Sequence, residues 1–238
     1  MENNITVVSG YWNINSKYES GIYNEWFSKT LKINQKYIFF GEEKDFENIQ
    51  KFRGDLETKF VDYPICNFYT KQFYRDHWVH QTHVPSKELG MIWNEKIHLM
   101  KLAKDSDENP TDFYLWVDAG VPPYRKKNPP EKKLNLISVN SLPHDKVCYS
   151  KVDESYHSYA ATVHIMHKNI IDKIHAVFYE YLEKLGNEVN DWRCGSDQFI
   201  FTKIRDENPE LFYEFTCVPA CNNDNGYGLN LVKLFDYC

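Results

Sequence analysis

The chain has 238 residues, enough for one large domain or two small ones, and no stretch has the composition of a linker. We therefore expect a single domain over residues 1–238. Hydrophobic residues make up 42% and charged residues 26%, which excludes a disordered chain. The net charge of −6 provides no basic field for a nucleic-acid backbone, so no nucleic-acid partner is expected.

The composition also bears on cellular location and on covalent or metal cross-links. No N-terminal apolar stretch resembles a signal peptide, and no apolar run approaches the roughly 20 residues that span a bilayer. The expectation is a cytoplasmic protein without a transmembrane segment. The six cysteines form no Cys-x-x-Cys pair, so free thiols are expected. His77, His80 and His83 drift around a helix and lack a fourth ligand, so zinc is not predicted.

The first third of the chain alternates between strand and helix patterns. Short β-branched or aromatic runs predict strands at Ile5–Ser9, Lys36–Phe40 and Thr58–Tyr63. Apolar residues recur at helical spacing between them, at Tyr18–Leu31 and Asp45–Arg53. Because consecutive β-α-β units form parallel strands covered by helices, this order predicts an α/β fold with a mostly parallel central sheet flanked by helices.

The rest of the chain continues this pattern with less regular spacing. Between Cys66 and Pro85 no period emerges, and Lys87–Lys104 then carries the apolar stripe of a helix. Asp112–Asp118 is an almost continuous apolar run, typical of a buried strand. Further strands are predicted at Asn135–Val139, Lys146–Ser150, Ala160–His167 and Leu211–Cys217, helices at Lys168–Leu185 and Gly195–Arg205, and a loop at Cys221–Gly228.

A short basic segment lies among prolines in this otherwise acidic chain. It contains Arg125, Lys126, Lys127, Lys132 and Lys133. Charged clusters between prolines are usually hydrated, so we interpret the segment as a solvated loop in preference to a phosphate or membrane contact.

Asp118 carries the most information about function. It ends a predicted buried strand, and open α/β sheets bind ligands outside the carboxyl ends of their strands. Ala119 and Gly120 follow, and their small size lets a ligand or metal approach the backbone. An aspartate that starts a turn or caps a helix would suit the same sequence. Position alone leaves both interpretations open.

Four segments, in their order and spacing, resemble the HtrL/YibB family of bacterial and viral proteins: Ile5–Trp12, Ile92–Ile97, Trp116–Gly120 and Gly195–Gln198. The resemblance covers roughly residues 5 to 217. It implies a single Rossmann-like domain of the GT-A type, the nucleotide-diphospho-sugar transferase fold, and a glycosyltransferase activity. It also implies a donor site at the loop after the first strand and at Asp118, with the acceptor side near the later helices.

We expect the nucleotide-sugar donor to contact residues from several parts of the chain. They are Ser9, Gly10, Tyr11, Trp12, Arg53, Asn94, Lys96, Asp118, Ala119 and Gly120. Transfer expels a nucleoside diphosphate, so a cation or backbone N–H groups must meet the growing charge. Lys96 suits this role, although a helix lysine is more often solvated. Tyr11 and Trp12 suit base stacking and core packing equally.

The resemblance also implies a divalent cation. In GT-A enzymes the strand usually ends in Asp-x-Asp, whose carboxylates hold a metal against the donor diphosphate. Here Gly120 occupies the third position, which leaves Asp118 alone. One carboxylate with phosphate oxygens and water can bind Mn²⁺ or Mg²⁺, so either ion is expected as cofactor with Asp118 as a ligand. Asp224 is a second candidate ligand, if the C-terminal loop folds over the donor.

Asp197 is the candidate catalytic residue on the acceptor side. It opens a predicted helix. In an inverting reaction it would act as the general base that takes the proton from the acceptor hydroxyl, and in a retaining reaction it would position a group or stabilise charge. An aspartate at a helix N-terminus is also favoured by the helix dipole, so a structural role stays open. Trp192 beside it is a candidate sugar platform, and His164 a candidate for lining the cleft.

These features together predict transfer of a sugar from a nucleotide-diphosphate donor, a UDP-sugar above all, to a glycan or glycoconjugate acceptor. The alternative is a non-catalytic nucleotide- or carbohydrate-binding module that keeps the fold, which the missing second aspartate favours. A dinucleotide oxidoreductase is disfavoured, because the segment Ser9–Trp12 after the first strand contains no Gly-x-Gly-x-x-Gly.

Overall fold

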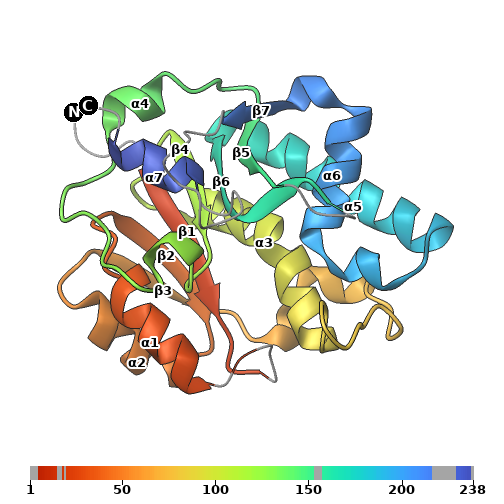
Figure 1. The fold of residues 1–238 in the computed structure, drawn as a ribbon, viewed down its shortest axis with the longest axis horizontal. Helices are drawn as coiled ribbons and strands as arrows, with labels where there is room; N and C mark the ends of the chain where they lie inside the picture. The colour runs from red at the N-terminus through yellow and green to blue at the C-terminus, as the bar shows by residue number, and fades with distance from the viewer. Residues whose placement is uncertain (1–4, 15–17, 19, 153–156, 216–228, 237–238) are drawn as a thin grey trace.

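Seven strands form one mixed sheet with the order β3-β2-β1-β4-β6-β5-β7 (Figure 1). The computed structural model describes residues 5–14, 18, 20–152, 157–215 and 229–236. Within this described sheet β6 alone runs antiparallel to its neighbours, β4 and β5. The strands are β1 (Ile5–Tyr11), β2 (Lys36–Gly41), β3 (Thr58–Asp62), β4 (Phe113–Val117), β5 (Val147–Lys151), β6 (Tyr159–His167) and β7 (Phe212–Phe215).

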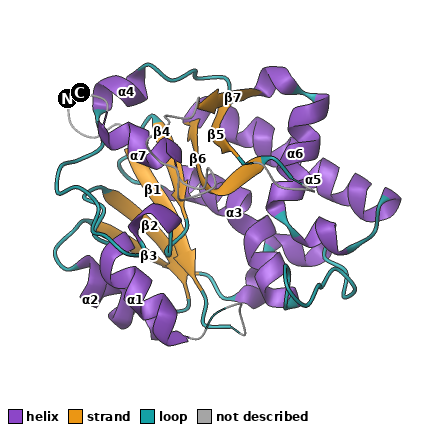
Figure 2. Ribbon diagram, in the orientation of Figure 1, coloured by secondary structure: helices purple, strands orange, loops and turns teal. Residues whose placement is uncertain are grey.

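Helices cover both faces of the sheet (Figure 2). They are α1 (Ser20–Thr30), α2 (Glu43–Arg53), α3 (Lys87–Ser106), α4 (Leu136–Asn140), α5 (Lys168–Glu188), α6 (Asp197–Glu207) and α7 (Leu229–Asp236), with short 3₁₀ helices η1 (Ile65–Asn67), η2 (Tyr69–Gln72), η3 (Pro122–Tyr124), η4 (Trp192–Gly195) and η5 (Pro209–Leu211). Apolar residues of α3, α5 and α6 form the core on one face, and those of α1, α2 and α7 the core on the other. The predicted helix-flanked, mostly parallel sheet is confirmed. Among the described residues, no helix combines the length and apolar character needed to cross a bilayer.

The central strand β4 contacts both cores, which explains its continuous apolar sequence. Tyr114 and Trp116 belong to the core beneath α3, α5 and α6, whereas Phe113, Leu115 and Val117 belong to the opposite one. All five are buried. In a strand covered on both faces, the side chains that point to either face are buried. The alternation of apolar and polar residues therefore disappears from its sequence. The prediction of a buried strand here is confirmed.

One predicted strand is wrong. Leu136–Asn140 forms the short helix α4, in place of the strand expected at Asn135–Val139. The Asn135 side chain accepts hydrogen bonds from the backbone N–H groups of Ile137 and Ser138, which caps the helix. β-branched residues suggested a strand, but Ile137 is 82% exposed and covers no neighbouring strand.

The stretch without a predicted period, Cys66–Pro85, is held to α3 by a buried carboxylate. Glu95 accepts hydrogen bonds from the backbone N–H groups of Tyr69 and Thr70, both at 2.8 Å, and from the Tyr63 hydroxyl at 3.1 Å. Burial raises the pKa of Glu95, and these hydrogen bonds oppose that rise. A single acidic side chain thus organises a segment that has no periodicity of its own.

The strand order changes direction between β1 and β4, and this point defines where a ligand can bind. From β1 the chain continues to β2 and β3 on one side, while β4 and the later strands lie on the other. Val8 pairs with Trp116, so the carboxyl ends of β1 and β4 reach the same edge of the sheet. Open α/β sheets bind ligands in the crevice outside such a switch point.

Arg53, expected to contact the nucleotide, lies away from that edge. Its side chain is 2% exposed at the end of α2. The guanidinium donates to backbone carbonyls that precede β2 and β3, at the amino ends of these strands: those of Leu31, Ile33, Gln35 and Glu57. Arg53 therefore joins the loops on the opposite side of the sheet from the switch point.

Replacing Arg53 by methionine is expected to lower the free energy of unfolding by about 3 kcal/mol or more, because several buried carbonyls lose a charged donor. Urea denaturation measures the loss. The control is Lys51→Met on the same helix, where the lysine side chain is 66% exposed, and its effect should stay within about 0.5 kcal/mol. Equal stability of the two variants would show that these carbonyls do not depend on Arg53.

Candidate active site

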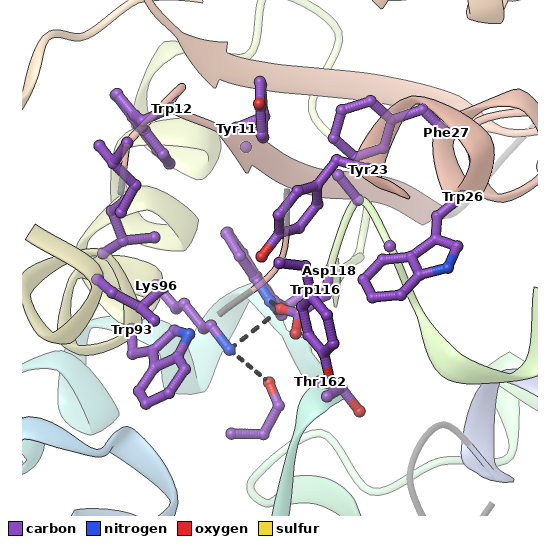
Figure 3. A pocket seen from close by; sticks show the side chains of 18 of the residues that line it. Tyr11, Trp12, Tyr23, Trp26, Phe27, Trp93, Lys96, Trp116, Asp118 and Thr162 are labelled. Atoms are coloured by element: carbon purple, nitrogen blue, oxygen red, sulfur yellow. Dashed lines mark hydrogen bonds and ion pairs between the residues drawn. The ribbon is translucent and has the colours of Figure 1, made fainter. Parts of the chain in front are cut away.

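A cavity of about 590 Å³ opens at the carboxyl edge of β1 and β4 (Figure 3). This volume lies within the range of small-molecule sites. The cavity collects residues from β1, α3, the segment after β4 and the start of α6, which are far apart in the sequence. The predicted site residues that line it are Gly10, Tyr11, Trp12, Lys96, Asp118, Ala119, Gly120 and Asp197.

Lys96 links the two predicted carboxylates. Its Nζ lies 3.1 Å from Asp118 Oδ1 and 3.0 Å from Asp197 Oδ2. It also donates to the backbone carbonyl of Ala161 at 3.1 Å. The side chains of Lys96 and Asp197 are 5% and 3% exposed, whereas that of Asp118 is 29% exposed. Figure 3 shows the lysine directed from α3 toward Asp118. The structure thus forms a buried ion cluster with Asp118 as its accessible member.

Burial and charge pull the pKa values of this cluster in opposite directions. Burial alone would lower the pKa of Lys96, but Asp118 and Asp197 outweigh it and raise that pKa, so the ammonium stays charged. Burial, opposed in part by Lys96, raises the pKa of Asp197 to about 6. Asp197 Oδ1 accepts the backbone N–H of Gln198 at 2.9 Å, and Oδ2 faces the ammonium. A carboxyl tuned toward neutral pH inside a cavity is typical of a functional group.

Local structure fixes the orientation of these side chains. The Ser86 side chain caps α3 by accepting the backbone N–H of Leu89. Asp118 lies one residue beyond β4, yet its N–H still donates to the Thr162 carbonyl on β6 at 2.9 Å. The indole N–H of Trp116 donates to Asp118 Oδ1 at 2.7 Å. The carboxylate is therefore held by its own backbone and by a neighbouring ring.

Aromatic side chains form another wall of the cavity (Figure 3). Tyr23 lies between Tyr11 and Trp26, with ring centroids 5.8 Å and 5.4 Å away. Trp12 is 3% exposed, and its indole N–H donates to the Tyr63 carbonyl at 2.8 Å. Of the two predicted stacking residues, Tyr11 is the more available to a ligand, whereas Trp12 is mainly a core residue.

Two predicted donor-site residues join elements of the fold. The Ser9 hydroxyl donates to the Val117 carbonyl at 2.7 Å, which ties β1 to β4. The Asn94 amide donates to the Cys194 carbonyl at 3.0 Å, which ties α3 to η4. Both side chains are buried and neither residue lines the cavity. Both polar groups, expected to contact the donor, are used within the fold.

The acceptor-side candidates also lie outside the cavity lining. His164 is fully buried on β6, where burial and the nearby Lys96 hold its pKa well below the usual range. Trp192 stacks on His83, with centroids 5.2 Å apart, and contacts His80 at 4.5 Å. The predicted cleft positions of His164 and Trp192 are therefore not supported.

The cavity also contains residues that the sequence did not single out. Tyr23, Trp26, Trp93 and Arg125 line it. Only the apolar period of α1 pointed to Trp26, and it marked no more than a buried helix face. Arg125 belongs to the basic segment interpreted as a solvated loop, and the structure places it half-buried in the cavity wall. Lys126, its neighbour, is exposed as expected.

The described residues do not form a metal centre. No group of three or more His, Cys, Asp or Glu side chains among them is placed to hold a metal ion. Asp118 and Asp197 each direct an oxygen at Lys96 Nζ, so the ammonium occupies the position from which one cation would contact both carboxylates. Asp224, the second expected ligand, lies outside the described residues.

Comparison with known proteins gives similarity of structure without similarity of sequence. No protein-family model and no curated protein matches the chain. Mouse xyloside xylosyltransferase 1 in its apo form is similar with a TM-score of 0.55 and 11% identity, over 98% of this chain and 93% of that one. The galactosyltransferase LgtC with donor and acceptor sugar analogues has a TM-score of 0.48 and 11% identity, over 96% of this chain and 94% of that one. Core-mannan synthase A from Aspergillus fumigatus in a Mn/GDP form has a TM-score of 0.47 and 10% identity, over 95% of this chain and 78% of that one.

The xylosyltransferase comparison and the strand order define the class of fold. The chain has the GT-A fold of glycosyltransferases, a seven-stranded and mostly parallel sheet flanked by helices. The predicted fold class is confirmed. At 11% identity the similarity shows the fold alone, and the resemblance to the HtrL/YibB family stays a prediction.

Lys96→Met is expected to destabilise the protein by about 3 kcal/mol or more, because it leaves a buried carboxylate without its cation. Adding Asp197→Asn removes that charge, so the double variant should be more stable than Lys96→Met alone. Chemical denaturation of the wild type, both single variants and the double variant gives the coupling energy. Strictly additive effects would show that Lys96 and Asp197 do not interact in solution.

Proposed function

We propose that the protein transfers a sugar from a nucleotide-diphosphate donor, a UDP-sugar in the first instance, to a glycan or glycoconjugate acceptor. The observation that carries the proposal is the Lys96–Asp118–Asp197 cluster, set in a cavity at the switch point of the sheet. The GT-A fold agrees with this function, although one fold can host many activities.

On the donor side, the cavity offers an aromatic wall beside a charged one. Tyr11 and Tyr23 line this wall with aromatic rings that suit a nucleoside. Asp118 and the small residues after it lie at the end of β4 and line the cavity beside this wall. The leaving group of this reaction is a nucleoside diphosphate, and its charge grows as the glycosidic bond breaks.

On the acceptor side, we propose Asp197 as the general base. With a pKa of about 6, its carboxylate is ionised at neutral pH and more basic than an ordinary aspartate. In this scheme the acceptor oxygen bonds to the sugar carbon, the nucleoside diphosphate leaves with the electron pair of the broken bond, and the hydroxyl proton passes to Asp197. Lys96 is a positioning residue that orients this carboxylate.

A binding module without catalysis is the second candidate function. Gly120 stands where a second carboxylate would complete Asp-x-Asp, and Lys96 already neutralises Asp118. Both observations fit a site that binds nucleotides without turning them over. Nucleotide binding without hydrolysis or transfer of any nucleotide sugar would favour this function.

A saturating nucleotide sugar is expected to stabilise the protein in a thermal-shift panel of UDP-, GDP- and CMP-sugars, by about 2.7 kcal/mol at 100 times its Kd. Asp118→Asn should reduce donor hydrolysis or transfer by about tenfold or more, equivalent to about 1.4 kcal/mol of transition-state stabilisation. The matched control is Asp206→Asn, whose carboxylate is 49% exposed on α6. Absence of any thermal shift, or unchanged turnover in Asp118→Asn, would contradict the proposal.

The pH dependence of transfer tests the role of Asp197. Its raised pKa means that the protonated form persists to a higher pH than in an ordinary aspartate, so activity is present above about 6 and lost as the pH falls through that value. Below it, kcat/KM should fall about tenfold per pH unit. A profile that stays flat down to about pH 5 would exclude Asp197 as the base.

A further inference from the structure

Arg125 is fixed in the cavity wall by two contacts. The centre of its guanidinium lies 3.8 Å from the ring centroid of Trp26, and Nε donates to the Gly120 carbonyl at 2.7 Å. Its two terminal nitrogens donate to no other described residue, and the residue lines the cavity. The guanidinium is thus oriented at one end and available to a ligand at the other.

Gly120 allows this arrangement. A Cβ atom at this position would come within 2.8 Å of Trp26 Cε3, so any other residue would force the ring to shift. Without a side chain, the backbone of Gly120 packs against Trp26 and its carbonyl accepts from Arg125. The position of the second Asp-x-Asp carboxylate is therefore occupied by the ring that supports the guanidinium.

The other cation of the cavity, Lys96, is already paired with anions of the protein. Its Nζ lies within 3.1 Å of Asp118 Oδ1 and Asp197 Oδ2 in ion pairs, and it donates a hydrogen bond to the Ala161 carbonyl. Lys96 therefore compensates the two carboxylates. Among the described lining residues, Arg125 is the cation whose donors remain available to an anion.

We infer that Arg125 binds the diphosphate of the donor, in place of a divalent cation chelated by two carboxylates. A guanidinium stays charged at all relevant pH values and offers paired N–H groups that match two phosphate oxygens. Its contact with Trp26 restricts the side chain before binding, which lowers the entropy cost of holding a ligand. The inference rests on the proposed function, because it takes the ligand to be a nucleoside diphosphate.

The first test compares nucleotide binding with and without metal. Titration calorimetry measures the Kd of UDP, GDP and inorganic pyrophosphate for the wild-type protein, in EDTA and then in MnCl₂. We expect at least one nucleotide to bind in EDTA, with a Kd within about threefold of that in MnCl₂, a difference of under 1 kcal/mol. Binding that appears only with MnCl₂ would overturn the inference.

The second test assigns the binding to Arg125. Arg125→Gln should raise the Kd of the bound nucleotide and of pyrophosphate by about tenfold or more, whereas Lys126→Gln, at the adjacent exposed residue, should change it less than about twofold. Arg125→Lys keeps the charge but loses the paired donors, so an intermediate Kd is expected. Unaltered affinity in Arg125→Gln, with the wild-type melting temperature, would overturn the inference.

The outcomes separate this inference from the proposed function. Nucleotide binding that requires MnCl₂, or that is indifferent to Arg125, contradicts the inference and leaves the proposed transferase standing. Pyrophosphate binding that depends on Arg125 while no nucleotide binds supports the anion site and contradicts the nucleotide-sugar function. Failure of every probe in both buffers contradicts both.

Discussion

The candidate site depends on one buried ammonium. Lys96 lies on α3, Asp118 follows β4 and Asp197 opens α6, so the ion cluster joins three elements that the sequence separates widely. Lys96 and Asp197 are buried, so either charge without its partner would be costly, whereas Asp118 is partly exposed. The shared ammonium holds both carboxylates in the wall of the cavity. It also explains why a charged cluster can exist between an aromatic wall and an apolar core.

The helix α3 serves the site through two consecutive residues. Glu95 accepts hydrogen bonds from the backbone N–H groups of Tyr69 and Thr70 and from the Tyr63 hydroxyl. Lys96 pairs with the two carboxylates of the cavity. The irregular segment and the ion cluster are therefore positioned by the same turn of helix. A shift of α3 along its axis would therefore disturb both sets of contacts.

The strands and helices could be predicted well from the sequence, because the patterns that indicate them are local. The β-branched runs and the helical periods depend on neighbouring residues, and the strand before Asp118 could be recognised from its apolar run alone. It predicted Lys96, Asp118 and Asp197 as site residues, and the structure places all three on one cavity. It did not distinguish Ser9 or Asn94, whose polar groups are used within the fold, from residues that line the cavity. It also missed Arg125, because only the tertiary position of Trp26 distinguishes that arginine from its solvated neighbours.

The close packing of Gly120 against Trp26 constrains how such a site can change during evolution. A single change of Gly120 to aspartate cannot simply add a second carboxylate, because its Cβ would collide with the indole and displace the ring that lies against Arg125. Conversion to an Asp-x-Asp site would require at least two coordinated substitutions, one at Gly120 and one at Trp26. Related chains should therefore vary at positions 120 and 26 together, with a small residue at 120 wherever a large ring occupies 26.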